Sequence, residues 1–405
     1  MNHGSWIKGT HQVRQENLVG FLVLAGVAVA VLLLGTFAPA PGDDTAEVST
    51  PASSARIAGK AAQYPLAREI VAPAGFINTP DGAPITIQEF IGAKVILLDI
   101  WTYSCINCVR TLPYLRAWHE KYADEGLLII GIHTPEFAFE KEIENVRAAT
   151  ERFGITWPVV LDNDRGTWTA YRNQYWPRKY LIDIDGFVVY DHIGEGGYEE
   201  TEAKIQELLK ERAEVLGERT EFADGTVDPK GVEGVDITRP RTPELYLGAW
   251  RNEGWGNGEP LVQGDADAVV PREPAGDAFY LGGRWNIAQE FAENRAAGAR
   301  IVLPYQASKV HMVLAPSEAA LALSPSTESR DELVEGVKVR VRLDGAPITE
   351  ADAGDNVIFG DGEPYILVDH DGLYRIVETA EGWGRHTFEL IVDGPGLEVY
   401  TFTFG

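Results

Sequence analysis

The chain of 405 residues is poor in sulfur-containing residues, with only two cysteines and two methionines. The two cysteines are close neighbours, as Cys105-Ile-Asn-Cys108, so no disulfide framework closes long loops in this sequence. A structural zinc site normally takes a full set of nitrogen or sulfur ligands, and no second CxxC pair is present to complete one. An isolated pair of neighbouring thiols therefore indicates thiol–disulfide exchange.

Basic residues are also scarce. Lysine and arginine number 35 against 61 aspartates and glutamates, which gives a formal net charge of -26. This excess of acidic groups disfavours nucleic acid or an anionic lipid surface as the main partner. The sequence also shows no Ser-His-Asp arrangement, no HExxH motif and no phosphate-binding P-loop. We therefore expect no nucleic-acid partner, no metal and no cofactor.

The segment from Leu18 to Ala38 contains no charged residue. A helix of this length would span the hydrocarbon core of a bilayer, which is about 30 Å thick. Lys8 and Arg14 precede the segment, and acidic residues follow it. The pattern predicts a single transmembrane anchor over residues 18–40.

The basic flank predicts the orientation of this anchor, because lysine and arginine favour the cytoplasmic side. Residues 1–17 are then a cytoplasmic N-terminus. Residues 41–405 would lie on the periplasmic or extracytoplasmic side of the cell inner membrane. A cleaved signal peptide is the alternative, since Ala38-Pro39-Ala40 resembles a small-residue cleavage site.

The remainder of the chain divides by composition and periodicity. Residues 41–63 are rich in Ala, Ser, Pro and Asp and predict a flexible spacer. Residues 64–216 alternate apolar strands with helices. Residues 217–243 show no periodicity and predict a linker. Residues 244–405 show the two-residue period of β-strands.

The strands and helices of residues 64–216 predict an α/β sandwich with a mixed sheet. Lys94–Trp101 and Leu127–Thr134 are continuous apolar runs of the kind buried on both faces of a sheet. Helices are expected from Cys105 toward Tyr122 and over Phe139–Phe153. A hairpin turns at Asp185-Gly186, followed by a last helix.

Alternating strands predict the class of the C-terminal part. Val337–Leu343 and Val310–Leu314 alternate along the chain, and Tyr400, Phe402 and Phe404 are expected on one face of the last strand. Turns rich in Gly, Pro and Asp separate these strands. The pattern predicts an all-β, antiparallel sandwich of jelly-roll type.

The position of the CxxC motif favours reactivity. It follows a buried strand and begins a helix, and a helix N-terminus carries partial positive charge and unpaired N–H groups that favour an anionic thiolate. Two intervening residues place Cys108 one turn further in, near Cys105. We expect Cys105 to be the exposed nucleophile and Cys108 to resolve the mixed disulfide.

Four features in this order resemble thioredoxin-fold redoxins of the TlpA/ResA group. Asp99 matches the buried acid of thioredoxins, and Pro113 matches the proline that kinks the active-site helix. Trp176-Pro177 matches the cis-proline loop that faces the CxxC motif. The fourth is the extra helix and strand inserted over about Ala138 to Asp162, before that loop, which is typical of this branch.

Three sequence stretches narrow the resemblance: WTYSCINCVRTLPY, YWPRKYLID and the ending LEVYTFTFG. They are similar to the extracytoplasmic redoxin and the carbohydrate-binding-module-like β domain of DipZ-type cytochrome c biogenesis proteins. The likeness covers roughly residues 64–405. Those proteins also carry a multi-helix electron-conducting membrane domain, whereas one anchor is expected here. The resemblance therefore implies a separate membrane electron donor.

The resemblance also implies roles for individual residues. Asp99 would move protons to or from the resolving thiol, although it could be an ordinary polar residue of the strand. Pro177 would be cis and place its backbone beside a client segment. Glu136 is similar to the active-site acid of ResA-like proteins, or else a solvated loop acid. Trp101 and Trp176 are expected either in the core or in a substrate groove.

The sequence therefore predicts a membrane-anchored, extracytoplasmic thiol–disulfide oxidoreductase, acting as a protein-disulfide reductase. Its clients would be disulfide- or thiol-bearing proteins, including apocytochrome c during cytochrome c maturation, or other secreted thiols in thiol homeostasis. The direction of electron flow does not follow from Ile106-Asn107.

Three alternatives from other classes stay open. Thr102-Tyr-Ser-Cys105 has the T-x-x-C spacing of peroxide-binding thiol peroxidases of the redoxin/AhpC-TSA type, although Leu98 stands where those have proline. Cys105, Cys108 and His133 could serve as soft copper ligands. The C-terminal part could bind a glycan through aromatic side chains that stack on sugar rings, although most such side chains lie in a core; the candidates are Tyr246, Trp250, Trp255, Trp285 and Trp383.

Overall fold

The computed structural model describes residues 51–223, 225–234, 239, 241–259, 261–322 and 336–405. The chain divides into two units, Met1–Ala55 and Arg56–Gly405, and the second unit contains both the α/β part and the β-rich part.

The α/β part is built on one mixed sheet. Six strands of the described residues form it in the order β1-β4-β3-β2-β5-β6. The three central strands β4, β3 and β2 are parallel, and the outer strands pair antiparallel. The strands are β1 (Gly75–Ile77), β2 (Val95–Trp101), β3 (Leu127–His133), β4 (Val159–Leu161), β5 (Arg178–Ile182) and β6 (Val188–Ile193), and the helices are α2 (Ile106–Tyr122), α3 (Ile143–Arg152), α4 (Gly166–Ala170) and α5 (Tyr198–Leu216).

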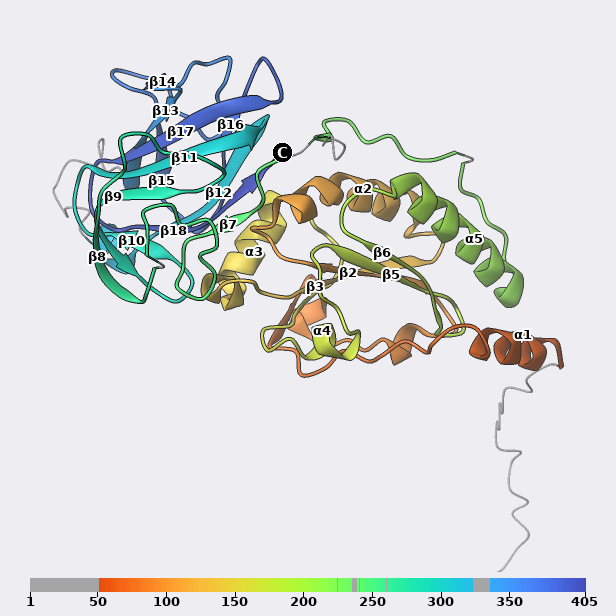
Figure 1. Ribbon diagram of the computed structural model, residues 1–405. Helices are drawn as coiled ribbons and strands as arrows, with labels where there is room; N and C mark the ends of the chain where they lie inside the picture. Colours follow the sequence, from red (N-terminus) through yellow and green to blue (C-terminus); the bar gives the residue numbers. More distant parts are fainter. Residues whose placement is uncertain (1–50, 224, 235–238, 240, 260, 323–335) are drawn as a thin grey trace, which may run out of the picture. The chain divides into compact units, whose positions relative to one another are not determined.

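Every residue of β2 is buried, as its apolar sequence predicts. Its side chains alternate between the two faces of the sheet. Val95, Leu97 and Trp101 belong to the core under α2, α3 and α5, whereas the even-numbered residues belong to the core on the side of α4. Figure 1 shows α2 and α5 on one side of the sheet and α4 on the other. The same alternation places Asp99 on the face that carries α2.

Two helical segments differ from the sequence-based expectation. The helix expected over Phe139–Phe153 is divided into a 3₁₀ turn, Ala138–Lys141, and α3. The two segments are separated at Glu142, whose backbone is extended with φ -75° and ψ 117°. At the start of the turn the Glu140 side chain accepts backbone N–H groups. In the segment expected as a flexible spacer, residues 51–61 form helix α1 (Pro51–Ala61).

The β-rich part contains twelve strands among the described residues, and all strand pairs are antiparallel. One large apolar core lies inside it, so the prediction of a β-rich C-terminal part is confirmed. The strands are β7 (Leu245–Tyr246), β8 (Gly264–Ala268), β9 (Tyr280–Ile287), β10 (Ala292–Asn294), β11 (Ala299–Ala307), β12 (Lys309–Pro316), β13 (Val337–Leu343), β14 (Ala346–Pro347), β15 (Tyr365–Val368), β16 (Gly372–Glu378), β17 (Gly384–Val392) and β18 (Leu397–Phe404), with a short helix α6 (Glu318–Ala322) after β12.

Strand β9 joins the two halves of this array. Its first residues, Tyr280–Gly282, pair with β11, and its last residues, Trp285–Ile287, pair with β10. Between them Gly283 has a φ of 90°, a conformation that glycine adopts at little cost. The strand thereby passes from one half of the array to the other, and the apolar core fills the space between the two halves.

A bulge in β18 redirects one aromatic side chain. The register against β12 shifts between Val399 and Thr401, which leaves Tyr400 as an extra residue. Phe402 lies in the β core, whereas Tyr400 packs against Phe137 of the α/β part, with ring centroids 5.0 Å apart. The prediction that the last three aromatic residues share one face is therefore wrong, because the pairing register of a distant strand decides it.

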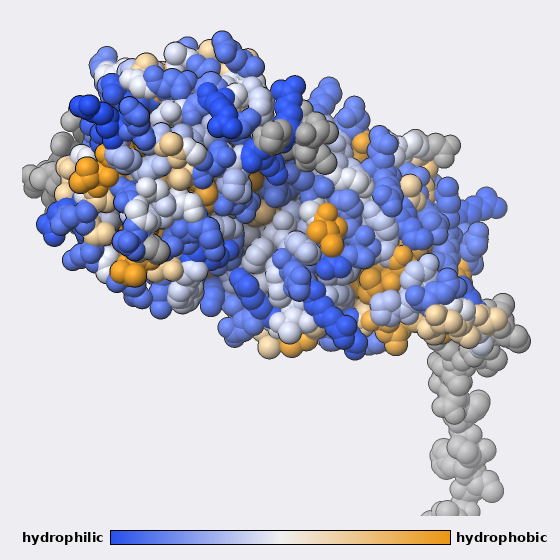
Figure 2. All heavy atoms as spheres, viewed as in Figure 1, coloured by the Kyte–Doolittle hydropathy of each residue, from blue (hydrophilic) through white to orange (hydrophobic). Residues whose placement is uncertain are grey.

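The predicted membrane anchor requires correction. Residues 18–40 lie outside the described residues, and within the described ranges no helix combines the length and the apolar character needed to cross a bilayer. The described residues therefore give no support to the predicted single N-terminal transmembrane helix, or to the single-pass location in the inner membrane that depended on it. The face shown in Figure 2 is mainly hydrophilic, with apolar residues in small separate groups.

Candidate active site

The two cysteines lie at the start of α2, as predicted. Cys105 is the N-cap residue, with φ -80° and ψ 115°, and the Val109 amide donates to its carbonyl oxygen at 3.0 Å. Cys105 is partly exposed and Cys108, one turn further, is buried. Both are free thiols. The arrangement presents one sulfur to solvent and keeps the second beneath it.

The buried thiol is hard to ionise. Burial raises the pKa of Cys108 well above its ordinary value, and the neighbouring Cys105 side chain, within hydrogen-bonding reach, raises it further. A hydrogen bond with the backbone of Thr102 acts in the opposite sense. Cys108 therefore holds its proton at neutral pH and needs a proton acceptor before it can act as a nucleophile.

Two charged residues lie beneath α2 and face each other across β2 and β5. Asp99 and Lys179 are directly paired in the antiparallel register, and both are buried. Burial raises the pKa of Asp99 to about 7, opposed by the attraction of Lys179. Burial lowers the pKa of Lys179, opposed first by Asp99 and then by Cys108. The three groups thus form one electrostatic cluster.

The atomic contacts leave room for a proton at Asp99. Its Oδ1 atom is buried and makes no hydrogen bond among the described residues. Lys179 uses its Nζ atom to donate to the Gly194 carbonyl at 3.2 Å. Sequence analysis did not single out Lys179. The available signal was a lysine directly opposite the predicted buried acid, at the start of an apolar strand.

A second buried acid, Glu140, organises the loops around the motif. Its carboxylate accepts from the hydroxyls of Thr102 (2.5 Å) and Ser104 (2.6 Å), and from the backbone N–H groups of Glu136 (2.6 Å) and Phe137 (3.0 Å). Burial raises the pKa of Glu140 to about 7 against the effect of these donors. Glu140 connects the turn before Cys105 to the loop after β3, and the sequence pattern gave no sign of it.

Glu136 lies in that loop after β3 and does not point freely into solvent. Its Oε1 atom accepts from the Tyr246 hydroxyl at 3.0 Å and from Arg251 at 2.8 Å. Both partners belong to the β-rich part. The residue predicted as an active-site acid therefore joins the two parts of the unit at the edge of the site.

Cys105 opens into a cavity of about 280 Å³ with walls from both parts of the unit. On the side of the α/β part, the cavity is lined by residues 104–107, Glu136 and the loop 174–176. On the other side the β-rich part contributes side chains from several strands and loops, namely Glu244, Tyr246, Arg251, Val313, Thr401 and Thr403. A disulfide that reaches Cys105 must enter between these two walls.

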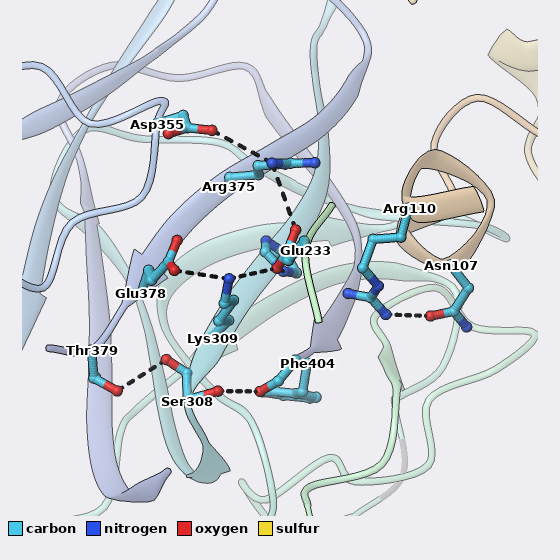
Figure 3. A network of polar contacts seen from close by, with 12 residues as sticks. Asn107, Arg110, Glu233, Ser308, Lys309, Asp355, Arg375, Glu378, Thr379 and Phe404 are labelled. Carbon is cyan, nitrogen blue, oxygen red and sulfur yellow. Dashed lines mark hydrogen bonds and ion pairs between the residues drawn. The ribbon is translucent and has the colours of Figure 1, made fainter. Parts of the chain in front are cut away.

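Arg110 holds Asn107, one of the two residues between the cysteines. Its guanidinium donates to Asn107 Oδ1 at 2.6 Å and forms a two-point ion pair with Glu195 (2.8 and 3.0 Å). Figure 3 shows Arg110 and Asn107 on α2, beside the network around Glu233. Glu233, from the predicted linker, lies near Lys309 (2.9 Å) and Arg375 (3.6 Å) of the β-rich part. These contacts attach that segment of the chain to the β-rich part.

The remaining predicted residues have different environments. The Trp176–Pro177 peptide bond is cis, as the resemblance implied. Trp176 lines the cavity of Cys105 and donates from Nε1 to the Thr134 carbonyl at 3.0 Å. Trp101 is 1% exposed and packs edge-on against His133, with centroids 5.2 Å apart. Of the two places expected for Trp101, the core is the one it occupies, and it does not line the substrate groove.

The environments of two residues bear on the alternative functions. Thr102 is fully buried and its hydroxyl is directed to Glu140, so it does not line an open peroxide site. His133 is fully buried, and burial lowers its pKa to about 3. Within the described ranges, no three His, Cys, Asp or Glu side chains gather in a way that could hold a metal ion.

The aromatic residues proposed for glycan binding do not form one surface. Trp285 is fully buried in the β core, and Trp255 packs partly against that core. Tyr246 is bound to Glu136, as described above. Trp250 is 66% exposed, and Arg239 lies over the ring of Trp383 at 5.8 Å.

Comparison with known proteins follows the same division of the chain. Residues 67–209 match the family model Redoxin, and residues 242–405 match the model described as "Thioredoxin like C-terminal domain". The protein DipZ of Mycobacterium tuberculosis (strain CDC 1551 / Oshkosh) is 40% identical over 243 residues, which are 59% of this chain and 34% of that protein. The chain therefore spans about a third of the length of DipZ.

Two shorter relatives match the redoxin part. The thiol-disulfide oxidoreductase YkuV of Bacillus subtilis (strain 168) is 26% identical over 31% of this chain and 85% of its own length. The thiol-disulfide oxidoreductase ResA of Halalkalibacterium halodurans is 29% identical over 33% of this chain and 72% of its own length.

The fold and the matched models together define a thioredoxin-like redoxin of the thiol–disulfide oxidoreductase type. More particularly, the chain is related to redoxins of the TlpA/ResA group and to DipZ, as the sequence motifs predicted.

Proposed function

We propose that this chain reduces disulfides in client proteins through the dithiol Cys105 and Cys108. The observation that supports this most directly is the placement of the two sulfurs. Cys105 begins a helix and lines an open cavity, and Cys108 lies buried within reach of it. On this proposal residues 64–216 form the redox domain, and residues 244–405 form a β domain that walls its active site.

The proposed reaction transfers two electrons from the protein to the client. The Cys105 thiolate attacks one sulfur of a client disulfide, which forms a mixed disulfide and releases the first client sulfur as a thiolate that takes up a proton. Cys108, once deprotonated, attacks the Cys105 sulfur. This step forms the Cys105–Cys108 disulfide and releases the second client thiol.

Asp99 supplies the proton acceptor that the second step needs. Burial raises the pKa of the Cys108 thiol, and the negative charge of Asp99 raises it further. With a pKa of about 7, Asp99 is ionised in a useful fraction of molecules at neutral pH. Lys179 stabilises that ionised form from the neighbouring strand.

The oxidised protein must be reduced again by a separate electron donor, a dithiol protein in this proposal. The relation to DipZ supports apocytochrome c cysteines as one client class, alongside other proteins with exposed disulfides. The same residues run the reverse reaction when the Cys105–Cys108 disulfide form meets a dithiol client: the client is oxidised and the protein disulfide is reduced.

Serine variants of the two cysteines test the proposal. Cys105→Ser should abolish reduction of a disulfide-bridged peptide, because the attacking sulfur is lost. Cys108→Ser should retain the first attack and accumulate a mixed disulfide that non-reducing electrophoresis and mass spectrometry detect. Full activity in both variants would rule out the assignment. The redox potential of the pair, measured against glutathione, then gives the direction of electron flow.

A further inference from the structure

A second cavity, of about 620 Å³, adjoins the cavity of Cys105. The two share four lining residues, so they lie side by side. Glu136 and Trp176 form the shared wall on the redoxin side, and Tyr246 and Arg251 form it on the β side. A volume of this size lies within the range of about 300–1,000 Å³ that is usual for ligand sites. The reaction proposed above uses only the smaller cavity.

An exposed aromatic ring stands at this larger cavity. Trp250 lines it and is 66% exposed, which is unusual for so large an apolar side chain. Arg165, on the redoxin side, lies over the rings of Trp168 and Trp176 at 5.5 and 5.2 Å. An indole face with a free side offers a stacking surface for an aromatic or proline side chain.

Both positively and negatively charged side chains line the larger cavity, and their charges partly neutralise each other. Arg251 is paired with Glu136 at 2.8 Å, and Glu290 accepts the Ala138 amide at 2.9 Å. Asn163 and Gln289 add amide groups that both donate and accept hydrogen bonds. Such a lining does not select a strongly charged ligand. It suits the alternating N–H and C=O groups of an extended peptide.

We infer that the larger cavity binds the polypeptide segment next to the client's cystine, with Trp250 stacking on an aromatic or proline side chain of that segment. The inference rests on the proposed function, because it takes Cys105 as the point of attack. The adjacency of the two cavities favours a peptide over a separate glycan, because a client held by its disulfide at Cys105 must place its flanking residues in adjacent space.

The test compares two substrates in the full chain. One is 2-hydroxyethyl disulfide, which has no flanking residues. The other is a cystine-bridged peptide with phenylalanine a few residues from the cystine, and a peptide with alanine at that place serves as its reference. In Trp250→Ala the ratio of kcat/KM for the phenylalanine peptide to that for the small disulfide should fall about fivefold, the loss expected for one stacking contact. Trp250→Phe should restore most of the ratio.

Val269→Ala is the matched control, because Val269 is an exposed apolar residue (83%) of the β domain that lines neither cavity. It should leave the ratio unchanged. An unchanged ratio in Trp250→Ala, with both substrates reduced by the unmodified protein, overturns this inference and leaves the proposed function standing. Failure of the unmodified protein to reduce either substrate overturns the proposed function itself.

The sugar alternative has its own readout. Tryptophan fluorescence is titrated with the phenylalanine peptide in Cys105→Ser, which cannot react, and separately with a soluble oligosaccharide. Because the chain has ten tryptophans, the change that is absent from Cys105→Ser combined with Trp250→Phe is the one assigned to Trp250. Quenching by the peptide supports the inference. Quenching by the oligosaccharide, with displacement of the peptide, assigns the cavity to sugar and overturns it.

Discussion

The two parts of the second unit use their buried positions differently. The redoxin part buries four titratable side chains around its thiols: Asp99, His133, Glu140 and Lys179. The β-rich part has one continuous apolar core. Its buried Glu389 pairs with Arg300, and among the described residues its one comparable buried group away from the thiols is His311, whose pKa burial lowers to about 3 beside Glu233. Charges that are buried without full pairing have shifted pKa values, and such groups gather where protons are transferred.

This difference indicates that the redoxin part carries the chemistry and that the β-rich part shapes access to the thiols. In the redoxin part burial brings two carboxyl groups to a pKa of about 7. The β-rich part forms one wall of the active-site cavity, and from this wall Tyr246 and Arg251 bind Glu136 in the loop after β3. Tyr400, turned outward by its bulge, packs against Phe137 and completes this contact. Variants that separate proton transfer from packing therefore test the contrast.

The largest effect is expected from Asp99→Asn. In the unmodified protein the step in which Cys108 attacks should speed up as pH rises through about 7, because Asp99 loses its proton there and becomes a base. The amide cannot accept the proton, so this inflection should vanish and the rate at pH 7.5 should fall about 100-fold, within the range usual for general bases. Stopped-flow tryptophan fluorescence of mixed-disulfide resolution measures both.

Glu389→Gln provides the control from the other part. Glu389 is also buried, but it pairs with Arg300 in the β-rich part, away from the thiols. Its amide variant should keep the inflection near pH 7. An inflection that persists in Asp99→Asn, or disappears in Glu389→Gln, would contradict the assignment of the proton acceptor.

A smaller effect is expected from Glu140→Gln, and it falls on stability. The backbone N–H groups at one Glu140 oxygen can only donate, so glutamine must turn its own oxygen to them and its NH₂ group to the hydroxyls of Thr102 and Ser104. Those two buried hydroxyls then lose the acceptor of their hydrogen bonds. The variant should lose about 2 kcal/mol of unfolding free energy, the cost of an unsatisfied buried group. Urea denaturation at pH 7 measures the loss.

Glu398→Gln is the matched variant in the β-rich part. Glu398 accepts from the Tyr400 hydroxyl at 2.8 Å, and an amide oxygen can accept that bond equally well. This variant should cost less than about 1 kcal/mol. Equal losses of unfolding free energy in the two variants would show that the four donors around Glu140 do not make it more important for stability than Glu398.

The sequence was sufficient where local patterns decide structure. The apolar run of β2, the helix that begins at the CxxC motif, and the helix Tyr198–Leu216 are all set by neighbouring residues. The cis bond before Pro177 and the buried state of Asp99 followed from the motif order. These features needed no knowledge of distant contacts.

Features decided by distant contacts were missed or misjudged. Glu140 sits in a polar stretch and acquires its role only when the turn before Cys105 folds against it. Lys179 meets Asp99 through strand register. Tyr400 changes face because β12 sets the pairing of β18. For Trp101 the core and the substrate groove were both open from the sequence, and the packing of α2 and α3 over its face of the sheet places it in the core.

The smallest effect is expected from Arg251→Ala, which breaks the ion pair between the two parts. Arg251 is 43% exposed in its side chain, so the pair with Glu136 should contribute no more than about 1 kcal/mol to unfolding. Glu136 also keeps its hydrogen bond from Tyr246. Arg340→Ala removes comparably exposed pairs with Asp393 and Glu363 inside the β-rich part and should cost about as much.

The two arginine variants should differ in kinetics although they agree in stability. Arg251 lies over the Tyr246 ring at 3.7 Å and lines both cavities, whereas Arg340 lines neither. Arg251→Ala should therefore raise KM for a disulfide-bridged peptide about two- to threefold, the modest loss usual for one peripheral contact, and Arg340→Ala should leave KM unchanged. Equal KM values in both variants would mean that the β-rich part only stands beside the active site, because a wall that clients touch must change their binding when one of its side chains is removed.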